Sequence, residues 1–364
     1  MSDFVLFTHT LWSEAPRIRH QVARLVASVG HRVLFVERAS HALAAAKPMM
    51  REAEPGITLL RGRRLVHHQL RPLRPLDWLN DTIAAASLRG LLRDARVAPG
   101  SKIINFAHDG AFLRREFPDH PLLTIIHDDF EAQARIPWFG HATRNLRATC
   151  HASDRVLAVS TPLVSRLSAW CSPELLLPWS QAPYLAPSSG TEDRDTLLFW
   201  GHIDVGLDTD RIRSMSRFLA RRHPRIRMLF VGPTQIPSRR ARTVERISGL
   251  ANVGVQDART LDELPLHRTL AALIPYRRKG DVDATELPNK ALPLLSRGLP
   301  IMKTGLPHMV RAPFILSVDD DAALEVAIGR CKQTFDEWQP LIRAMVESNG
   351  PAARLRTLGI DPAR

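Results

Sequence analysis

The first half of the chain alternates short apolar runs with segments of helical periodicity. Residues 4–8 and 32–37 are continuous apolar runs of strand length, and between them Val22 and Leu25 lie at helical spacing before Gly30. A strand, a helix and a strand this close together form a βαβ unit, which implies a parallel sheet. The same alternation predicts further strands at 57–60, 103–106, 122–126, 155–159 and 175–177, and helices at 17–30, 77–95, 141–151 and from 161 onward.

A second series of the same kind follows a linker. Residues 181–195 carry Pro, Ser, Gly and charge without any period. Beyond them we expect strands at 197–200, 228–231, 253–255, 271–275, after 298 and at 315–318, with helices at 208–222, 238–249, 261–269, 286–297 and 321–347. The pattern predicts an α/β protein with two doubly wound Rossmann-like domains facing across a cleft, 1–182 and 195–345. Residues 346–364 form a tail that could pack back on the N-terminal domain.

The chain is strongly basic. Lys and Arg number 50 against 37 Asp and Glu, which leaves a formal net charge of +13. Such an excess indicates an anionic partner, such as phosphorylated small molecules, nucleic acid or anionic lipid. An arginine-rich amino-acid usage without functional meaning is the alternative. Aromatic residues make up only 6% of the chain, which disfavours nucleic-acid binding by base stacking.

Several signals bear on the compartment. The three cysteines, Cys150, Cys171 and Cys331, are far apart and lack CxxC or Cys/His metal spacing, so we expect neither a disulfide framework nor a zinc site. The N-terminus lacks the charged and apolar regions of a signal peptide. No apolar run reaches the about 18 residues of a membrane span. We therefore expect a cytoplasmic protein, held at most peripherally on the inner face of the membrane.

Polar side chains follow the predicted N-terminal strands, where the carboxyl ends of parallel strands usually bind ligands. The His127-Asp128-Asp129 cluster is suited to general-base chemistry, because neighbouring carboxylates raise one another's pKa. Alternatively, one of the two caps the following helix and the other is solvated. A histidine near a helix start can likewise serve packing alone. The other candidates at these strand ends are His9, Arg19, His20, His108 and Asp109.

The strongest signal in the second half is the segment 274–302, IPYRRKGDVDATELPNKALPLLSRGLPIM. Lys290 lies in the first turns of its predicted helix, where a positive charge is poorly placed for helix stability but well placed for a diphosphate. A surface lysine is the alternative. Gly201, between a strand and a helix, would let backbone N–H groups approach a phosphate, although a plain tight turn accounts for it as well.

Four segments resemble bacterial GT-B glycosyltransferases in the same order along the chain. PNKALPLLSRGLPIM is similar to their K-L-x-E-Y-L-A-x-G-x-P-V-V segment, and RIRHQVARLVASVGHRVLFVE is similar to their opening R-x-H-x-L-A-x-x-L-A-x-x-G-H-x-V-x-F-V-E. RVLAVSTPLVSRL resembles the segment after their last N-domain strands, and TLLFWGHID resembles the opening of their donor domain. Together these segments span most of the chain.

The resemblance implies a nucleoside-diphosphate sugar donor, with UDP as the expected nucleotide, and no other cofactor. It implies donor binding by Gly201, His202, Tyr276, Arg277, Glu286, Asn289 and Lys290, with Lys290 on the diphosphate. The acceptor would lie beside His9, Arg19, His20, His108 and Asp109. By similarity to inverting exopolysaccharide glucuronosyltransferases, Asp129, or else Asp128, is the expected base. Such enzymes need no metal for transfer.

The chain departs from the family in one place. Where many members have a ribose-binding glutamate, it has Pro293, which should kink the helix or start it late. Asp281-Val-Asp283 matches a metal-binding DxD only in its letters. Pro293 supports an alternative, a non-catalytic nucleotide- or carbohydrate-binding protein of the same fold. A basic nucleic-acid-binding protein is the second alternative.

The sequence thus predicts a hexosyl- or glucuronosyltransferase of cell-surface polysaccharide or glycolipid assembly, acting on a saccharide or lipid-linked hydroxyl. The basic stretch 61–76 could lie on anionic headgroups through Arg63, Arg64, Arg71 and Arg74; a solvated basic loop is the alternative.

Overall fold

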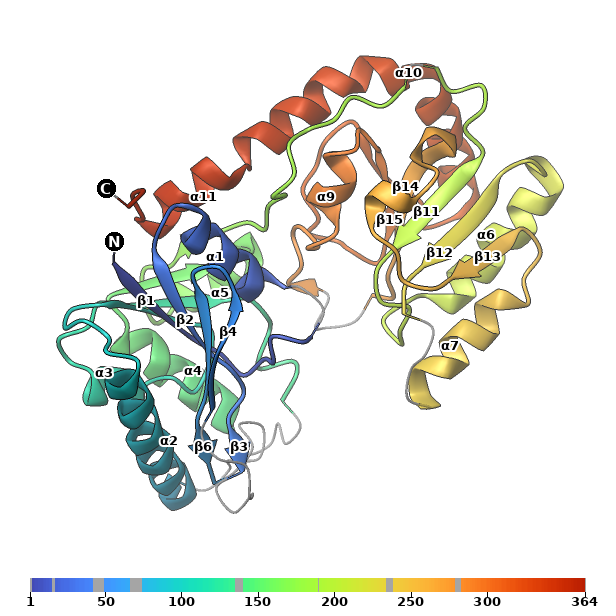
Figure 1. The fold of residues 1–364 in the computed structure, drawn as a ribbon. Coiled ribbons are helices and arrows are strands. Elements are labelled where there is room, and N and C mark those ends of the chain that lie inside the picture. The colour runs from blue at the N-terminus through green and yellow to red at the C-terminus, as the bar shows by residue number, and fades with distance from the viewer. Residues whose placement is uncertain are drawn as a thin grey trace. The chain divides into compact units, whose positions relative to one another are not determined.

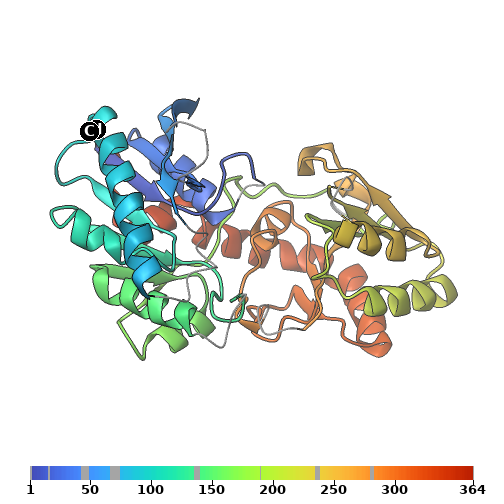
Figure 2. The ribbon, with the colours of Figure 1, turned by 90° about the horizontal axis from the view of Figure 1, so that it is seen from below.

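The computed structural model describes residues 2–14, 17–41, 49–65, 74–134, 140–188, 190–233, 238–278 and 283–363. The chain divides into two compact α/β units (Figures 1 and 2). The first unit comprises Met1–Leu177 together with Pro351–Arg364, and the second comprises Pro178–Gly350. The last residues of the chain therefore belong to the same unit as the first.

The first unit is built on an eight-stranded sheet of order β10-β9-β8-β7-β1-β2-β5-β4. All its pairings are parallel except that of β4 with β5. β3 (Ser40–His41) and β6 (Arg63–Arg64) pair separately. The strands of the large sheet are β1 (Asp3–Phe7), β2 (Arg32–Val36), β4 (Met49–Glu54), β5 (Ile57–Arg61), β7 (Lys102–Asn105), β8 (Leu122–Ile126), β9 (Arg155–Ala158) and β10 (Glu174–Leu175).

Helices cover this sheet and are fixed by local signals that the sequence carries. In α5, which was predicted from residue 161 onward, Ser160 caps the helix by accepting a hydrogen bond from the Leu163 N–H, and Pro162 lies in the first turn. The core beneath α2 is formed by buried aliphatic and aromatic side chains of β1, β2, β7 and α3. The helices are α1 (Ile18–Ser28), α2 (Arg74–Asp94), α3 (Phe112–Glu116), α4 (His141–Ala152), α5 (Thr161–Leu167) and α11 (Pro351–Leu358).

The second unit holds a fully parallel six-stranded sheet of order β13-β12-β11-β14-β15-β16. Its strands are β11 (Thr196–Trp200), β12 (Arg227–Val231), β13 (Val253–Gln256), β14 (Thr269–Pro275), β15 (Ile301–Thr304) and β16 (Ile315–Ser317). Its helices are α6 (Thr209–Arg222), α7 (Ser238–Ser248), α9 (Ala291–Leu295) and α10 (Asp321–Ser348). The sheet is continuously apolar: β14 is buried at all seven positions.

Each sheet reverses its strand order once. In the first unit the chain runs outward from β1 to β2 and later restarts on the other side at β7. In the second unit it runs from β11 to β12 and β13 and restarts at β14. Ligands of doubly wound sheets bind beyond the carboxyl ends of the strands at such switch points. The residues that follow β1 and β7, and those that follow β11 and β14, are therefore the places to look for a site.

The structure corrects some predicted elements. The helix predicted at 261–269 is replaced by two 3₁₀ turns, Leu261–Glu263 and Leu266–Arg268, because Pro265 lies between them. The helix predicted at 286–297 shrinks to the five residues of α9. The sequence analysis also missed β4, an edge strand without alternation, and α11. Among the described residues, no helix is long and apolar enough to cross a membrane.

Candidate functional site

Glycines line the carboxyl edge of the second sheet. Gly201, Gly232 and Gly305 directly follow β11, β12 and β15. Gly201 has φ +132° and Gly305 has φ +66°, conformations that L side chains rarely adopt. A Cβ at Gly232 would collide with the Gly201 carbonyl, and a Cβ at Gly305 with the Tyr276 carbonyl. The glycines therefore let adjacent loops pack backbone against backbone around the switch point.

Lys290 lies at the centre of this edge. Its Nζ lies 3.9 Å from the ring centroid of Phe199 and 5.1 Å from that of Tyr276. A Cβ on Gly201 would come within 2.8 Å of the same Nζ. Burial lowers the pKa of Lys290 to about 7, although the Asp204 carboxylate acts in the opposite direction. The amine is thus held in a largely apolar place where an anion would restore its charge.

The loop after β11 is fixed against the end of β14. Leu207 and Tyr276 form an antiparallel bridge, and the Arg277 N–H donates to the Gly206 carbonyl at 2.9 Å. The Gly206 N–H in turn donates to the Asp204 carboxylate at 2.9 Å. Burial raises the pKa of the Tyr276 phenol, so this group stays neutral. The edge that carries Lys290 is therefore built in advance of any ligand.

The remaining donor-side candidates are distributed more widely. His202 follows Gly201 and is partly buried, and Asn289 beside Lys290 is exposed. The Glu286 carbonyl accepts a hydrogen bond from the Val310 N–H at 3.0 Å. The Arg277 side chain lines a separate pocket with arginines of α7, described below. The predicted role of these four residues in donor binding stays a prediction.

Pro293 and α9 change the picture of the donor helix. Lys290 is the residue before α9, and Pro293 lies in its first turn, so the helix does start late as predicted. A helix of five residues has little dipole to offer. The Lys290 amine, rather than the helix end, is what this segment presents to an anion.

The first unit has a pocket at its own switch point. Its volume is about 160 Å³. His9 and Thr10 follow β1, Phe106 and His108 follow β7, and His127 and Asp128 follow β8, so the pocket brings together polar residues from three strand ends. Of the predicted acceptor-side residues, His9, Arg19 and His108 line it. Asp109 lines an adjoining pocket that shares His9.

His9 and Asp109 form the closest pair at this switch point. The His9 Nε2 lies 2.5 Å from an Asp109 carboxylate oxygen, and the buried Arg64 donates to the His9 Nδ1 at 3.3 Å. Burial lowers the pKa of His9 to about 4 against the opposing effect of Asp109. His9 is therefore neutral, with its proton on Nε2. Arg64, which the sequence analysis assigned to a lipid-facing stretch, points instead into the protein.

The other members of that basic stretch give little support to a lipid surface. Arg63 pairs in β6 with Ser40 of β3. Arg71 and the Arg74 side chain lie outside the described residues, as do Lys279 and Asp281. Asp283, the second aspartate of the DxD-like letters, lies 3.8 Å from the Arg278 guanidinium. Among the described residues no cluster of His, Cys, Asp and Glu is arranged to hold a metal ion.

Arg19 and His127 form a second buried pair. A guanidinium nitrogen of Arg19 donates to the His127 Nε2 at 2.7 Å. Because arginine can only donate, the His127 Nε2 must accept through its lone pair, and the His127 ring is therefore neutral. Burial, together with the charge of Arg19, keeps the pKa of His127 well below its usual value. The 3.3 Å approach of Asp128 to the same nitrogen is therefore no ion pair.

The two adjacent aspartates have different surroundings. The Asp129 carboxylate is buried; it pairs with the Arg166 guanidinium at 2.6 Å and accepts from the Ala132 N–H at 3.0 Å. The Asp128 side chain is 38% exposed and lines the pocket. The helix that one of the pair was expected to cap is absent: residues 130–133 form a turn, and Asp129 closes this turn through the Ala132 N–H. Of the two aspartates, only Asp128 lines the pocket.

His20 and several residues that the sequence reasoning missed complete the picture. The His20 ring is buried, stacked on Phe35 at 5.5 Å, and its Nδ1 accepts from the Arg17 N–H at 3.1 Å. It is a packing and capping residue. Phe130, which stacks on His108 at 4.8 Å, and His141 at the start of α4 also line the pocket. Phe130 is apolar and His141 lies in a predicted helix, so a search for polar residues at strand ends could not find them.

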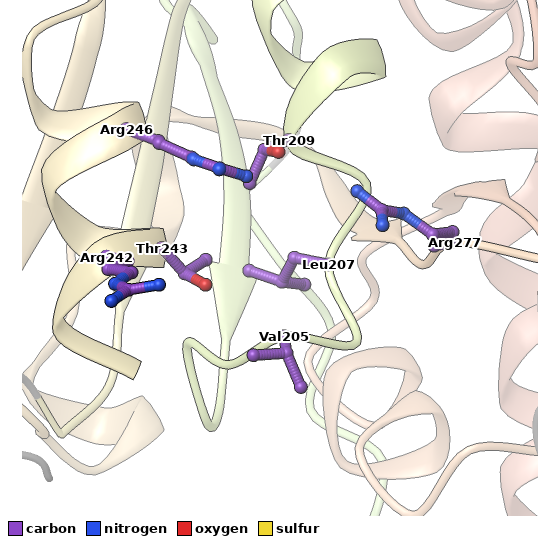
Figure 3. Close-up of a pocket in the computed structure, with 7 residues that line it drawn as sticks. All are labelled: Val205, Leu207, Thr209, Arg242, Thr243, Arg246 and Arg277. Atoms are coloured by element: carbon purple, nitrogen blue, oxygen red, sulfur yellow. The ribbon is translucent and has the colours of Figure 1, made fainter. Parts of the chain in front are cut away.

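A third pocket, in the second unit, has a volume of about 290 Å³ (Figure 3). Arg242, Thr243 and Arg246 of α7 line one side, and Arg277 enters from the other. Between them lie Val205, Leu207 and Thr209, from the β11–α6 loop and the start of α6. The sequence analysis selected Arg277 alone from this group.

Comparison with known proteins identifies the fold. The chain matches no protein-family model, and no curated protein matches it significantly. Among solved structures, it is similar to a trehalose-phosphate synthase (UDP-forming) from Burkholderia xenovorans in complex with glucose-6-phosphate. The TM-score is 0.68 and the identity 11%, over 98% of each chain.

Two further solved structures are similar over nearly their whole length. The lipopolysaccharide outer core galactosyltransferase WaaB has a TM-score of 0.63 and 11% identity over 98% of each chain. Anabaena HepE, in complex with UDP and glucose, has a TM-score of 0.63 and 11% identity over 99% of this chain and 98% of its own. At such identity the likeness establishes the fold alone. The chain has the GT-B fold of these glycosyltransferases, with two Rossmann-like units, as the sequence predicted.

Proposed function

We propose that this chain is a metal-independent glycosyltransferase. It moves a sugar from a nucleoside-diphosphate sugar, with UDP as the nucleotide, to a hydroxyl of a saccharide or lipid-linked acceptor in cell-surface polysaccharide or glycolipid assembly. The observation that carries the proposal is Lys290, an amine held over two aromatic faces beside Gly201 at a switch point. The similar structures that hold UDP or are named UDP-forming support the choice of nucleotide.

The donor diphosphate is assigned to the edge formed by Gly201, Tyr276 and Lys290. A phosphate oxygen near the Lys290 Nζ would raise its pKa and fix the positive charge, which then stabilises the negative charge on the departing nucleotide. The absent Cβ of Gly201 leaves the space that the amine occupies. Electrostatic stabilisation of this kind can perform the role that a metal has in other transferases.

The acceptor is assigned to the pocket of the first unit. Asp128 takes the proton from the attacking hydroxyl, since it is the more exposed of the two carboxylates that line the pocket, and the other, Glu14, is paired with Arg38. His9, held by Asp109 and Arg64, and His127, held by Arg19, are neutral and line this pocket without adding a charge of their own beside Asp128. The hydroxyl oxygen forms the new bond to the anomeric carbon as the bond to the diphosphate breaks. A single displacement inverts that carbon.

Calorimetric titration with UDP, GDP, ADP and CMP, without metal, tests the donor site. We expect UDP to bind at about micromolar strength and Lys290→Ala to lose at least about tenfold in affinity, because a charge-assisted contact is removed. Lys332→Ala, an exposed lysine of α10, is the matched control and should bind as the wild type does. If UDP binding is absent, or equal in all three proteins, the donor site is not at Lys290.

A non-catalytic binding protein is the second candidate, and Pro293 favours it. This residue stands where similar enzymes place a ribose-binding glutamate, so the donor could bind without being turned over. Release of UDP from a panel of UDP-sugars, measured with and without simple saccharide acceptors, separates the two. The non-catalytic candidate is favoured if UDP binds in a manner that depends on Lys290 but the protein cleaves none of the UDP-sugars.

A further inference from the structure

The pocket between α6 and α7 lies apart from Lys290. α6 and α7 belong to crossovers that run from β11 to β12 and β13, whereas α9 belongs to the crossover from β14 to β15 in the opposite direction. Since such crossovers are right-handed, α6 and α7 cover one face of the sheet and α9 the other. The α6–α7 pocket and the Lys290 amine are therefore two different places on the second unit. They are joined through Leu207, which lines the pocket and is bridged to Tyr276, whose ring contacts the Lys290 amine.

Three arginines surround this pocket. Arg242 and Arg246 are four residues apart and share one face of α7, and Arg277 approaches from the end of β14 (Figure 3). None of the seven lining residues is acidic, and none of the three guanidinium groups has an ion-pair partner among the described residues. The nearest carboxylates along α6 are engaged elsewhere: Asp208 caps the helix, and Asp210 pairs with Arg213. Among the described residues, no direct ion pair neutralises these three charges.

A buried hydroxyl forms the floor of the pocket. Thr209, only 4% exposed, lines the pocket, and its Oγ1 has no hydrogen-bond partner among the described residues. A buried polar group without a partner is costly and uncommon. Thr209 is also the first residue of α6, a helix of 14 residues whose N-terminal end favours negative charge. A ligand acceptor atom at this point would satisfy the hydroxyl.

The walls of the pocket are held in place. Asp208 N–H donates to the Pro275 carbonyl at 2.9 Å, and the neighbouring Leu207 is paired with Tyr276. Leu207 and Thr243 are buried, so the floor is rigid while the arginines form the rim. A volume of about 290 Å³ is at the lower end for small-molecule sites. This volume suits a small phosphate ester and not a polymer.

We infer that the pocket of Thr209, Arg242, Arg246 and Arg277 is a second phosphate-binding site, separate from the proposed donor site. It takes the phosphate group of a small phosphate ester, with the guanidinium forks on the phosphate oxygens and the Thr209 hydroxyl as a fourth donor. The inference does not depend on the proposed transfer reaction. A phosphorylated monosaccharide and a nucleoside monophosphate are the two ester classes of suitable size.

Calorimetric titration with inorganic phosphate tests the inference. We expect the Arg242→Gln/Arg246→Gln double variant to bind phosphate at least about tenfold more weakly than wild type, and Thr209→Val about threefold more weakly. Arg222→Gln, an exposed arginine at the other end of α6, is the matched control and should bind phosphate as wild type does. Glucose 6-phosphate and uridine monophosphate, titrated in parallel, identify the ester class by the tighter of the two.

Lys290→Ala separates this inference from the proposed function. The inference is supported if phosphate binding survives Lys290→Ala and is lost in the arginine double variant, whether or not UDP binds. It is overturned if phosphate binds equally to all variants or to none. It is also overturned if phosphate binding is lost in Lys290→Ala and kept in the double variant, a result that would leave the donor site standing.

Discussion

At the scale of single residues, three side chains are defined by what surrounds them. Lys290 is an amine whose charge is weakened by burial, Asp128 is a carboxylate open to a pocket, and Asp129 is a carboxylate enclosed by Arg166. The first two have surroundings that leave room for a ligand, whereas the third is already satisfied. Two predictions follow from these differences.

Binding of UDP should be coupled to proton uptake at Lys290. In the protein without ligand, burial lowers the pKa of the Lys290 amine to about 7, and a bound diphosphate raises it. Above pH 7 the wild type must therefore take up a proton on binding, and its affinity falls as the pH rises; below pH 7 the amine is already charged and this dependence vanishes. Calorimetry at pH 8 in buffers of different ionisation enthalpy measures the uptake. Lys290→Arg, which stays charged, should show none.

The two aspartates should separate activity from stability. We expect Asp128→Asn to lower kcat by about 100-fold with little change in Tm, because a general base is lost without breaking the fold. Asp129→Asn should cost about 1–3 kcal/mol of stability, because it removes the buried charge that pairs with Arg166 and leaves this guanidinium only Glu131, at 3.8 Å. The rate of UDP release and the thermal unfolding of both variants show which aspartate acts in catalysis and which stabilises the fold. The opposite pattern would make Asp129 the base.

At the scale of elements, strand ends define the sites, and glycines let those ends approach. The apolar runs of the sequence predict β1, β8, β11 and β12 within a residue or two, because fully buried strands need continuous apolar side chains. The extent of α9 was not predictable in the same way. Leu287, Leu292 and Leu295 are buried and continue the apolar spacing of a helix, but the helix itself begins only at residue 291. Pro288 and Pro293 delay the helix.

Gly232→Ala tests the packing of the loops after β11 and β12. A Cβ at this position collides with the Gly201 carbonyl, which is backbone and has little freedom to move. We expect a loss of about 2 kcal/mol or more in stability and a weaker affinity for UDP, since Gly201 adjoins Lys290. Gly329→Ala, in α10 with open space around it, is the control and should be neutral or stabilising. Equal thermal unfolding of both variants would contradict this account.

At the scale of the whole molecule, the chain returns to the unit in which it began. α11 packs on α1, and the Ala363 N–H donates to the Val29 carbonyl at 2.8 Å. The His31 Nε2 donates to the Asp361 carbonyl at 2.7 Å, and Lys102 and Arg155 donate to the Gly359 and Thr357 carbonyls. The final residues are thus a structural part of the first unit.

Deletion of residues 351–364 should destabilise the first unit alone. It removes the buried Leu358 and Ile360 and the carbonyls to which His31 and Arg155 donate. We expect calorimetric unfolding to show one transition lowered by about 5 °C or more and the other unchanged. Substitution of Ala352 by Ser, at an exposed position of α11, is the control and should shift neither transition. A deletion that leaves both transitions in place would show that the tail is dispensable.

The sequence by itself determined that the chain forms two mainly parallel sheets. It also determined where most of their strands lie along the chain and which polar residues follow them. Apolar runs and helical periodicity are local properties, and a buried parallel strand requires them whatever its neighbours are. The strand-end rule accordingly selected His9, Asp109 and Asp128, which do meet at one switch point. Lys290 and Gly201 were selected by local pattern and resemblance, and they also meet.

Only the tertiary structure decided which of these groups remain available to a ligand. Asp128 and Asp129 are identical neighbours in sequence, and the difference between them is Arg166, a residue of α5. His9 and His127 are neutral chiefly because they are buried, and each has a ring nitrogen that accepts from a distant arginine, Arg64 and Arg19, which lie 55 and 108 residues away from them. Charge, pKa and the room for a ligand depend on such distant partners, because burial and electrostatic contacts are set by packing between elements and not by sequence order.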